Sequence, residues 1–464
     1  MRAKSTYRGH GKGAGRVYPV PELNTVTQST ANTEPDLLPD ADVTEGLLSE
    51  PLQCFALRSI PGGTEHSSVQ VKNFRYLGSY NWLDAPHPTI LVPGSPDIWR
   101  DRPVPFRVPF DEGLQIFDPN GYHMGSSSSS PLLPLFRAVD VVAEDNADTS
   151  MDWPSIDIVA DRGSLRKLLR WIKHEDSQRL QVSEPSSTTQ AGSYPSAKLQ
   201  DFRIDLQLGG AKTVLMQRWD TRTCQYVTPP NFGCRVNFEK ATLTPAPGCE
   251  LSSDHYRIIQ YELEGLQMVV RFEVDACIAP PSTASDSESA NDLSDALAGL
   301  SLACQTLPPP GPGATVSTSP DNLDSIVKVI HGGTQVPQSS IIEISTRSVK
   351  GAHRHNWEET YTQLFLSQTP LHYLAVHERG QFRTITTRPL NMPEFQRIAA
   401  RDSVQRNFKQ LICLLREIQA LVTKHGRRGH LSLVCRDGRL EVFERGDGND
   451  IGCLPDSELA RFGL

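Results

Sequence analysis

The chain has 464 residues, a net charge of −8, 38% hydrophobic residues and 35 prolines. This length suffices for one large or two ordinary domains, but the low hydrophobic content indicates that part of the chain stays outside a packed core. No apolar stretch approaches the roughly 20 residues of a transmembrane helix, and the polar N-terminus is unlike a secretory signal. Membrane, lipid-bound and secreted proteins are therefore not expected.

Cysteine usage and charge distribution narrow the class further. The nine cysteines are scattered without Cys-x-x-Cys spacing, which argues against zinc ribbons and disulfide frameworks and favours a reducing, intracellular compartment. Residues 1–30 carry five basic and one acidic residue, whereas residues 31–57 and 276–325 each carry six acidic residues and no basic one. The acidity lies in segments that resemble unfolded chain, so it does not exclude a polyanionic substrate.

The first 50 residues are polar and aperiodic, which predicts a disordered tail. Its basic start is either a solvated tail or a segment for nucleic-acid binding or nuclear import. Strands are expected over residues 74–83 and 89–92, the second at a sheet edge because Pro93 ends it. Apolar residues at helical spacing predict a helix over residues 164–173, with Ser164 as its N-cap.

The rest of the chain predicts one domain, residues 51–464, with two polar interruptions. Residues 175–197 have the composition of a linker, and residues 278–325 that of a disordered insertion. Helices are expected over residues 357–366 and 408–424. Further strands are expected over residues 202–208, 213–219, 326–330, 340–345, 371–377, 382–387, 431–435 and 440–443. This tally predicts an α+β fold with a mixed, mostly antiparallel double β-sheet and flanking helices.

Carboxylates stand inside three apolar segments, at Glu239, at Glu273 with Asp275, and at Glu343. A carboxylate in such a run must be paired, hydrogen-bonded or bound to a cation, because burying an unpaired charge costs several kcal/mol or more. Glu273 and Asp275 are expected on one face of a strand, since side chains alternate. Few basic residues stand beside these acids, so the pattern indicates a site for one or two Mg²⁺ or Mn²⁺ ions. The alternative for each acid alone, Glu239 above all, is a solvated strand position.

The order of these motifs resembles the DXO-type decapping nucleases, a family that includes the nuclear partner of a 5′-to-3′ exoribonuclease. The resemblance spans about residues 55–460. It rests on Arg162 at the first helix, Phe238-Glu239 after Gly233, Glu273-Val-Asp275, Glu343-Ile-Ser345, Gln363-Leu-Phe-Leu, and Cys453-Leu-Pro455. It implies a core like that of the PD-(D/E)xK nucleases and a metal-dependent hydrolase acting on RNA 5′ ends. Such an enzyme removes incomplete or noncanonical caps or pyrophosphate, and can degrade the RNA from 5′ to 3′.

The resemblance also implies roles for individual residues. Glu239, Glu273, Asp275 and Glu343 would be catalytic metal ligands, with a further ligand from the Ile344 carbonyl. Arg162 and Gln363 would contact the RNA 5′ end, where the planar fork of an arginine suits phosphate oxygens. A 5′-to-3′ exoribonuclease is the expected protein partner, and the nucleus or the cytoplasm the expected location.

One position departs from the family pattern, because the lysine of its Glu-x-Lys motif is Ser345 here. A serine supplies no positive charge, so Arg347, Lys350 or Lys240 would have to take over that role. If none does, the chain is a weakened enzyme or a pseudoenzyme that binds RNA or a partner. His353 and His355 flank Arg354, and they either bind metal or phosphate or form an ordinary loop pair.

Several other enzyme classes are excluded by motifs that the chain lacks. It has no Asp-Asp pair of the kind that holds Mg²⁺–diphosphate in prenyl-diphosphate synthases. It has no Gly-x-x-x-x-Gly-Lys phosphate loop, no Gly-x-Gly-x-x-Gly fingerprint and no Gly-x-Ser-x-Gly nucleophile elbow.

Overall fold

The computed structural model describes residues 17–18, 40–58, 68–125, 130–145, 151–183, 199–230, 233–279, 326–426, 430–446 and 452–463. Most of the predicted N-terminal tail and nearly all of the predicted insertion at 278–325 lie outside these residues. The described residues up to Ile278 and from Val327 onward belong to one compact unit; a second unit, residues 279–326, contributes only its two end residues to the description. No helix among the described residues is long and apolar enough to cross a membrane.

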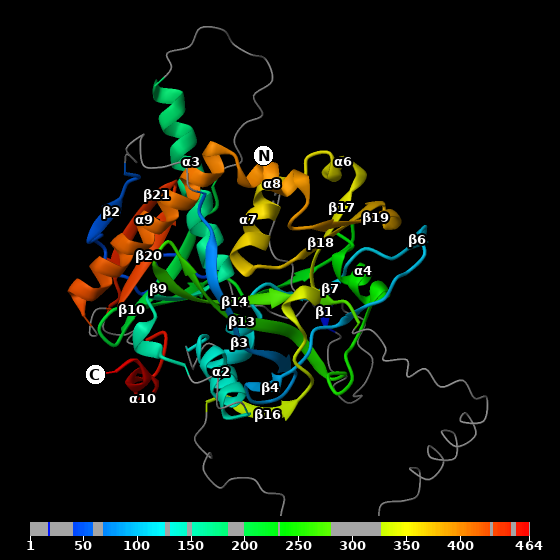
Figure 1. Ribbon diagram of the computed structural model, residues 1–464, viewed down its shortest axis with the longest axis horizontal. Coiled ribbons are helices and arrows are strands. Elements are labelled where there is room, and N and C mark those ends of the chain that lie inside the picture. Colours follow the sequence, from blue (N-terminus) through cyan, green and yellow to red (C-terminus); the bar gives the residue numbers. More distant parts are fainter. Residues whose placement is uncertain are drawn as a thin grey trace, which may run out of the picture. The chain divides into compact units, whose positions relative to one another are not determined.

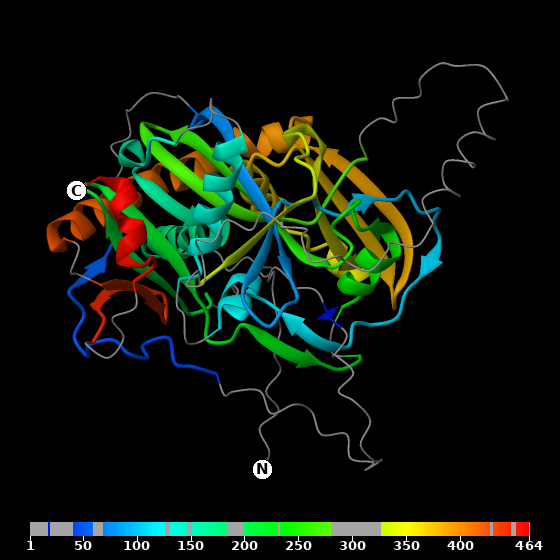
Figure 2. The same ribbon diagram turned by 90° about the horizontal axis from the view of Figure 1, so that it is seen from below.

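Most described strands belong to one large, mixed sheet (Figures 1 and 2). Its pairs are mostly antiparallel, with parallel pairs only where β8 meets β14 and β10 and where β16 meets β4, within the described residues. From edge to edge its strands are β16 (Lys328–Gly332), β4 (Thr89–Pro93), β3 (Val71–Leu83), β13 (Ser252–Leu263), β14 (Leu266–Val274), β8 (Ile158–Asp161), β10 (Thr213–Trp219), β9 (Phe202–Gly209), β20 (Leu431–Arg436), β21 (Arg439–Glu444) and β2 (Gln53–Phe55).

A smaller sheet carries β17 to β19, which lie side by side at the right of Figure 1. From edge to edge its strands are β12 (Leu243–Thr244), β5 (Ile98–Trp99), β15 (Ala276–Cys277), β17 (Ile341–Ser348), β18 (Leu371–Glu378), β19 (Gln381–Pro389) and β6 (Phe106–Arg107). A third, minor sheet joins β1 (Val17–Tyr18), β7 (Gly113–Ile116) and β11 (Cys224–Val227). The predicted mixed, mostly antiparallel double sheet is confirmed, with this minor sheet added.

Helices cover both faces of the large sheet. The α-helices of the described residues are α1 (Pro119–Met124), α2 (Leu133–Asp145), α3 (Arg162–Ser183), α4 (Arg235–Thr242), α6 (Val349–Ala352), α7 (Trp357–Ser367), α8 (Pro393–Ala399), α9 (Asp402–His425) and α10 (Asp456–Leu459). Successive side chains of β14 point to opposite faces of the large sheet. Met268 and Val270 pack against α3, α7, α8 and α9 on one face, and Val269 packs against α2 on the other. A third apolar cluster, around Phe238 and Phe382, fills the space between α4 and the smaller sheet.

Several expectations differ from the observed elements, among them the disordered tail, because Val17–Tyr18 within it pair with β7. The strand β4 is not at an edge, because β16 pairs with it after the insertion; Pro93 is its last residue, where a missing N–H disturbs the ladder least. Helix α3 begins at Arg162, so Ser164 is inside its first turn and is not the N-cap. The same helix continues to Ser183, so residues 175–183 are helical where the polar composition predicts a linker, and residues 184–198 lie outside the described part.

Candidate functional site

Three of the four predicted acidic residues come together where the large sheet passes into the smaller one. Glu239 lies on α4, Asp275 is the single residue between β14 and β15, and Glu343 lies on β17. Each is at most 7% exposed. Ala276 pairs with Ile342 in the antiparallel ladder between β15 and β17, which brings Asp275 next to Ile344 of β17. The N–H of Ile344 donates to Oδ2 of Asp275 at 2.6 Å. We call Glu239, Asp275 and Glu343 the acidic cluster.

The carboxylates of Asp275 and Glu343 repel each other within this cluster. Burial and the charge of Glu343 raise the pKa of Asp275 to about 6, although the guanidinium of Arg235 and the N–H of Ile344 oppose the rise. A carboxyl whose pKa lies near neutrality can exchange a proton at physiological pH, which is a common property of acids in active sites.

Arg162 and Gln363 hold Glu343 from the side of α3 and α7. Nη1 of Arg162 donates to Oε2 of Glu343 at 2.8 Å, and the amide of Gln363 donates to the other carboxylate oxygen. Arg162 also lies over the ring of Phe272, with Cζ 5.5 Å from the ring centre. Arg162 and Gln363, two of the four residues predicted to contact substrate, therefore reach the cluster, and in this structure they bind its glutamate Glu343.

Arg235 holds the other two carboxylates and was not among the predicted site residues. Its Nε donates to Oε1 of Glu239 at 2.7 Å, and its Nη2 donates to Oδ1 of Asp275 at 2.8 Å. Burial alone would lower the pKa of Arg235, but the charges of Glu239, Asp275 and Glu273 outweigh it and hold that pKa well above the ordinary value. The i,i+4 spacing of Arg235 and Glu239 could have revealed the pair, but only once the segment is recognised as a helix. Glu239 was expected on a strand.

The remaining predicted residues lie around the cluster. Glu273 is half-buried on β14, opposite Tyr256 in the ladder with β13, and its charge reaches Arg235. Arg347 is half-buried near the end of β17; burial, and then the charge of Arg235, lowers its pKa. Lys350 on α6 and Lys240 on α4 are both exposed, and within the described residues neither is ion-paired with the acidic cluster.

The carboxylates of the acidic cluster are the right chemical groups for a hard metal ion, but they are not arranged to bind one in this structure. Carboxylate oxygens are the ligands that Mg²⁺ and Mn²⁺ prefer. In the described part of the chain, however, no group of three or more Asp, Glu, His or Cys side chains is placed to hold a metal ion. The reason is visible in the contacts, because Arg235 and Arg162 occupy the oxygens that a metal would bind. The expected metal cage is thus a set of ion pairs in this structure.

Solved structures of Rai1 proteins resemble this fold. Rai1 of Scheffersomyces stipitis in complex with (3′-NADP)⁺ and calcium ion has a TM-score of 0.50 at 9% identity, covering 89% of this chain and 99% of that chain. Rai1 of S. pombe has a TM-score of 0.48 at 11% identity, covering 84% and 99%. Rai1 of Candida albicans in complex with pU5-Mn²⁺ has a TM-score of 0.47 at 10% identity, covering 88% and 96%. At such identities the likeness concerns the fold alone.

Sequence comparison gives the family. No curated protein matches the chain. A family model described as "Domain of unknown function (DUF8563)" matches residues 53–184 and 194–443. The chain therefore belongs to the DUF8563 family.

Proposed function

We propose that this protein is a hydrolase that acts on RNA 5′ ends, removing incomplete or noncanonical caps or pyrophosphate, with 5′-to-3′ degradation as a possible second step. The observation that carries the proposal is the acidic cluster: three buried carboxylates from remote parts of the chain meet at one point. Such a cluster stabilises a fold poorly, because every buried charge loses its hydration. Functional need is the usual reason for keeping one.

The fold supports this proposal, as does the resemblance of the motif order to the DXO-type decapping nucleases. Rai1 of S. stipitis, which shares the fold, was crystallised with a dinucleotide, (3′-NADP)⁺, and with calcium. A 5′-to-3′ exoribonuclease partner and a nuclear or cytoplasmic location are further expectations from the same resemblance.

Roles for the site residues follow from their contacts. Asp275 accepts the N–H of Ile344 through Oδ2, which fixes its carboxylate within the acidic cluster, where it is suited to hold a cation. Arg162 and Gln363 can exchange their bonds to Glu343 for bonds to a phosphate, to which a guanidinium donates with its planar fork.

A divalent cation, Mg²⁺ or Mn²⁺, is part of the proposal. Glu239, Glu273, Asp275 and Glu343 would hold one or two ions together with the Ile344 carbonyl. This requires Arg235 to release Glu239 and Asp275, so ion binding and a movement of Arg235 are coupled in the proposal.

The test uses the purified full-length protein with Mn²⁺ and three RNAs that carry a 5′-triphosphate, an unmethylated cap or an NAD cap. Released products are identified by mass spectrometry. Asp275→Asn and Glu273→Ala should abolish product formation. Glu441→Gln is the matched control, because Glu441 is equally buried at 7% exposure and ion-paired with Arg439 at 2.9 Å, but lies on β21. Full activity in Asp275→Asn would overturn the proposal.

A second candidate is a non-catalytic module of the same fold that binds RNA or a partner. It is favoured by Ser345 in the lysine position and by the arginines that already neutralise the carboxylates. Ser345→Lys separates the two candidates. If the wild type is inactive and Ser345→Lys hydrolyses RNA much faster, the site is intact and lacks only the positive charge of the lysine. An active wild type would exclude this candidate.

A further inference from the structure

One face of the smaller sheet carries basic side chains next to the acidic cluster. Glu343 of β17 is opposite His372 of β18, and His372 is opposite Arg388 of β19. Side chains two residues apart on a strand point to the same face, so Ser345 and Arg347 share the face of Glu343. The line from Glu343 across these strands thus passes from a carboxylate to an imidazole and then to a guanidinium group.

The segment between α6 and α7 adds one more basic residue to this face. The ring centre of His355 lies 5.8 Å from that of His372 and 4.4 Å from that of Trp357. Cζ of Arg388 lies 4.4 Å from the ring centre of Trp357. Arg347 is close enough that its charge acts on both imidazoles. We call Arg347, His355, His372 and Arg388 the basic face.

The carboxylates of β17 and of the start of α7 do not neutralise this face. Glu343 is paired with Arg162, Glu358 with Lys173, and Glu359 with two arginines of α3. Within the described residues, neither Arg347 nor Arg388 forms an ion pair with a carboxylate. Two half-buried guanidinium groups therefore lie close to two imidazoles without a carboxylate partner among the described residues, an arrangement that favours the binding of an anion.

Three buried nitrogen atoms of the basic face also have no hydrogen-bond partner among the described residues. They are Nδ1 of His372, Nδ1 of His355 and Nε of Arg388. His372 is fully buried, and its other nitrogen lies 3.1 Å from Oγ of Ser345. The other nitrogen of His355 lies 2.8 Å from Oγ1 of Thr360, so both rings are fixed in orientation. Buried polar atoms are nearly always hydrogen-bonded, and an unmet set in one place indicates a missing ligand.

We propose that the basic face binds a phosphate group of the nucleic-acid substrate, beside the acidic cluster. Phosphate offers several strong acceptor oxygens, and guanidinium and imidazolium groups are its usual donors. The choice of RNA as the source of the phosphate rests on the proposed function, whereas the phosphate site itself rests on the basic face alone. The positive charge that Ser345 cannot supply is then delivered two residues further along β17, by Arg347.

The protonation of the two histidines fits an empty anion site. Burial and the charges of Arg347 and Arg388 lower the pKa of His355 to about 4. Burial, His355 and the same two arginines lower the pKa of His372 to about 3. A bound phosphate adds the negative charge that both imidazoles lack, so it should draw protons onto them.

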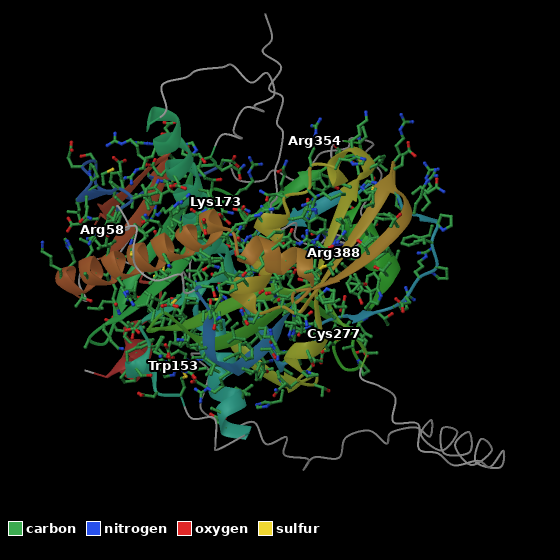
Figure 3. The ribbon with its side chains drawn as sticks, turned by 45° about the horizontal axis from the view of Figure 1, so that its top comes forward. Arg58, Trp153, Lys173, Cys277, Arg354 and Arg388 are labelled. Atoms are coloured by element: carbon green, nitrogen blue, oxygen red, sulfur yellow. The ribbon has the colours of Figure 1, made fainter. Side chains whose placement is uncertain are left out.

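The test measures inorganic phosphate binding to the full-length protein by calorimetry and by ¹⁵N NMR of labelled histidines. Arg388→Gln and Arg347→Gln should each weaken binding at least about tenfold, because each removes charge-assisted hydrogen bonds. Arg354→Gln is the control, since Arg354 is exposed and comes from the same loop as His355. In Figure 3, Arg354 lies near the upper edge of the view and Arg388 lies nearer its centre.

Binding that is absent, or that is equal in Arg388→Gln and Arg354→Gln, would overturn the proposal, as would unchanged resonances of His355 and His372. Arg388→Lys and Arg347→Lys keep the charge and should retain part of the binding even if the glutamine variants fold poorly. Thermal melts check folding in each case.

A competition arm separates this inference from the proposed function. A 5′-phosphorylated RNA oligonucleotide should displace inorganic phosphate. Displacement without any hydrolysis would leave the phosphate site standing and contradict the hydrolase. Phosphate binding that RNA does not displace would contradict the assignment to a nucleic-acid substrate.

Discussion

Nη1 of Arg162 lies 2.8 Å from Oε2 of Glu343, and about nine-tenths of each side chain is buried. The pair links the first residue of α3, which packs on the large sheet, to β17 of the smaller sheet. The same contact thus neutralises one acid of the cluster and ties the two sheets together.

Arg162→Gln should destabilise the protein by about 3–5 kcal/mol, because it leaves Glu343 buried without its charged partner. The double variant with Glu343→Gln should recover part of this loss. Urea unfolding of the four proteins in this cycle measures the coupling. Arg383→Gln is the control, since its pair with Glu378 is exposed and should change stability by no more than about 0.5 kcal/mol. Additive single effects at Arg162 and Glu343 would contradict the prediction.

Arg235→Gln should create a protein whose melting temperature responds strongly to Mn²⁺. Without Arg235, Glu239 and Asp275 lose the guanidinium group that bridges them, so the variant should melt lower than the wild type in chelator. A divalent cation can then take the freed oxygens and restore stability through binding to the native state. Thermal melts with and without Mn²⁺ measure the difference.

The control for that experiment is Arg461→Gln, because Arg461 also joins two carboxylates, those of Asp140 and Glu458, outside the acidic cluster. Equal Mn²⁺ stabilisation of both variants would show a general effect of carboxylates that have lost their arginine partner. It would contradict a metal site at the cluster.

Native stability should fall as pH falls from about 6.5 toward 4, partly because of His372 and His355. Their pKa values are lowered to about 3 and about 4, so the native state stays unprotonated where the unfolded chain already binds protons. Each of the two histidines contributes up to about 1.4 kcal/mol per pH unit to the fall in the free energy of unfolding in that pH range. His372→Gln should therefore show a shallower decline.

The measurement is urea unfolding at several pH values in buffer without phosphate, with His87→Gln as an exposed control. Burial has the largest effect on the pKa of His372, and the charged groups that act on it, His355, Arg388 and Arg347, are all basic and lower that pKa in the same direction. An unchanged pH slope in His372→Gln would count against a neutral buried imidazole.

Arg347→Gln should lower any RNA hydrolysis at least about tenfold, because Arg347 carries the positive charge on β17 that is missing at Ser345. Adding Ser345→Lys to that variant should restore part of the rate, since residue 345 lies on the same face, closer to Glu343. Single-turnover rates on the RNA that the wild type prefers measure both steps. Activity that is indifferent to Arg347, or a double variant no faster than Arg347→Gln, would show that another group supplies the charge.

Local sequence patterns predicted most strands and helices around the site correctly. The apolar run at Ile341–Ser348 and the helix Trp357–Ser367 were expected at nearly their observed bounds. Glu343 was predicted as buried because three isoleucines surround it, and it is buried. Glu239 was expected on a strand, since Phe238-Glu239 is too short a segment to show its helical period.

The chain by itself determined the burial of Glu343, the mixed character of the sheets and the order of the motifs, because side-chain periodicity and composition are local properties. Only the tertiary structure decided which charges meet. Arg235 binds Asp275 from 40 positions away, and His372 reaches Arg388 and His355 through strand register and loop placement. Electrostatic partners depend on distance in space, which one-dimensional patterns do not contain. The sequence therefore predicted a metal cage, where the fold forms ion pairs beside a basic face.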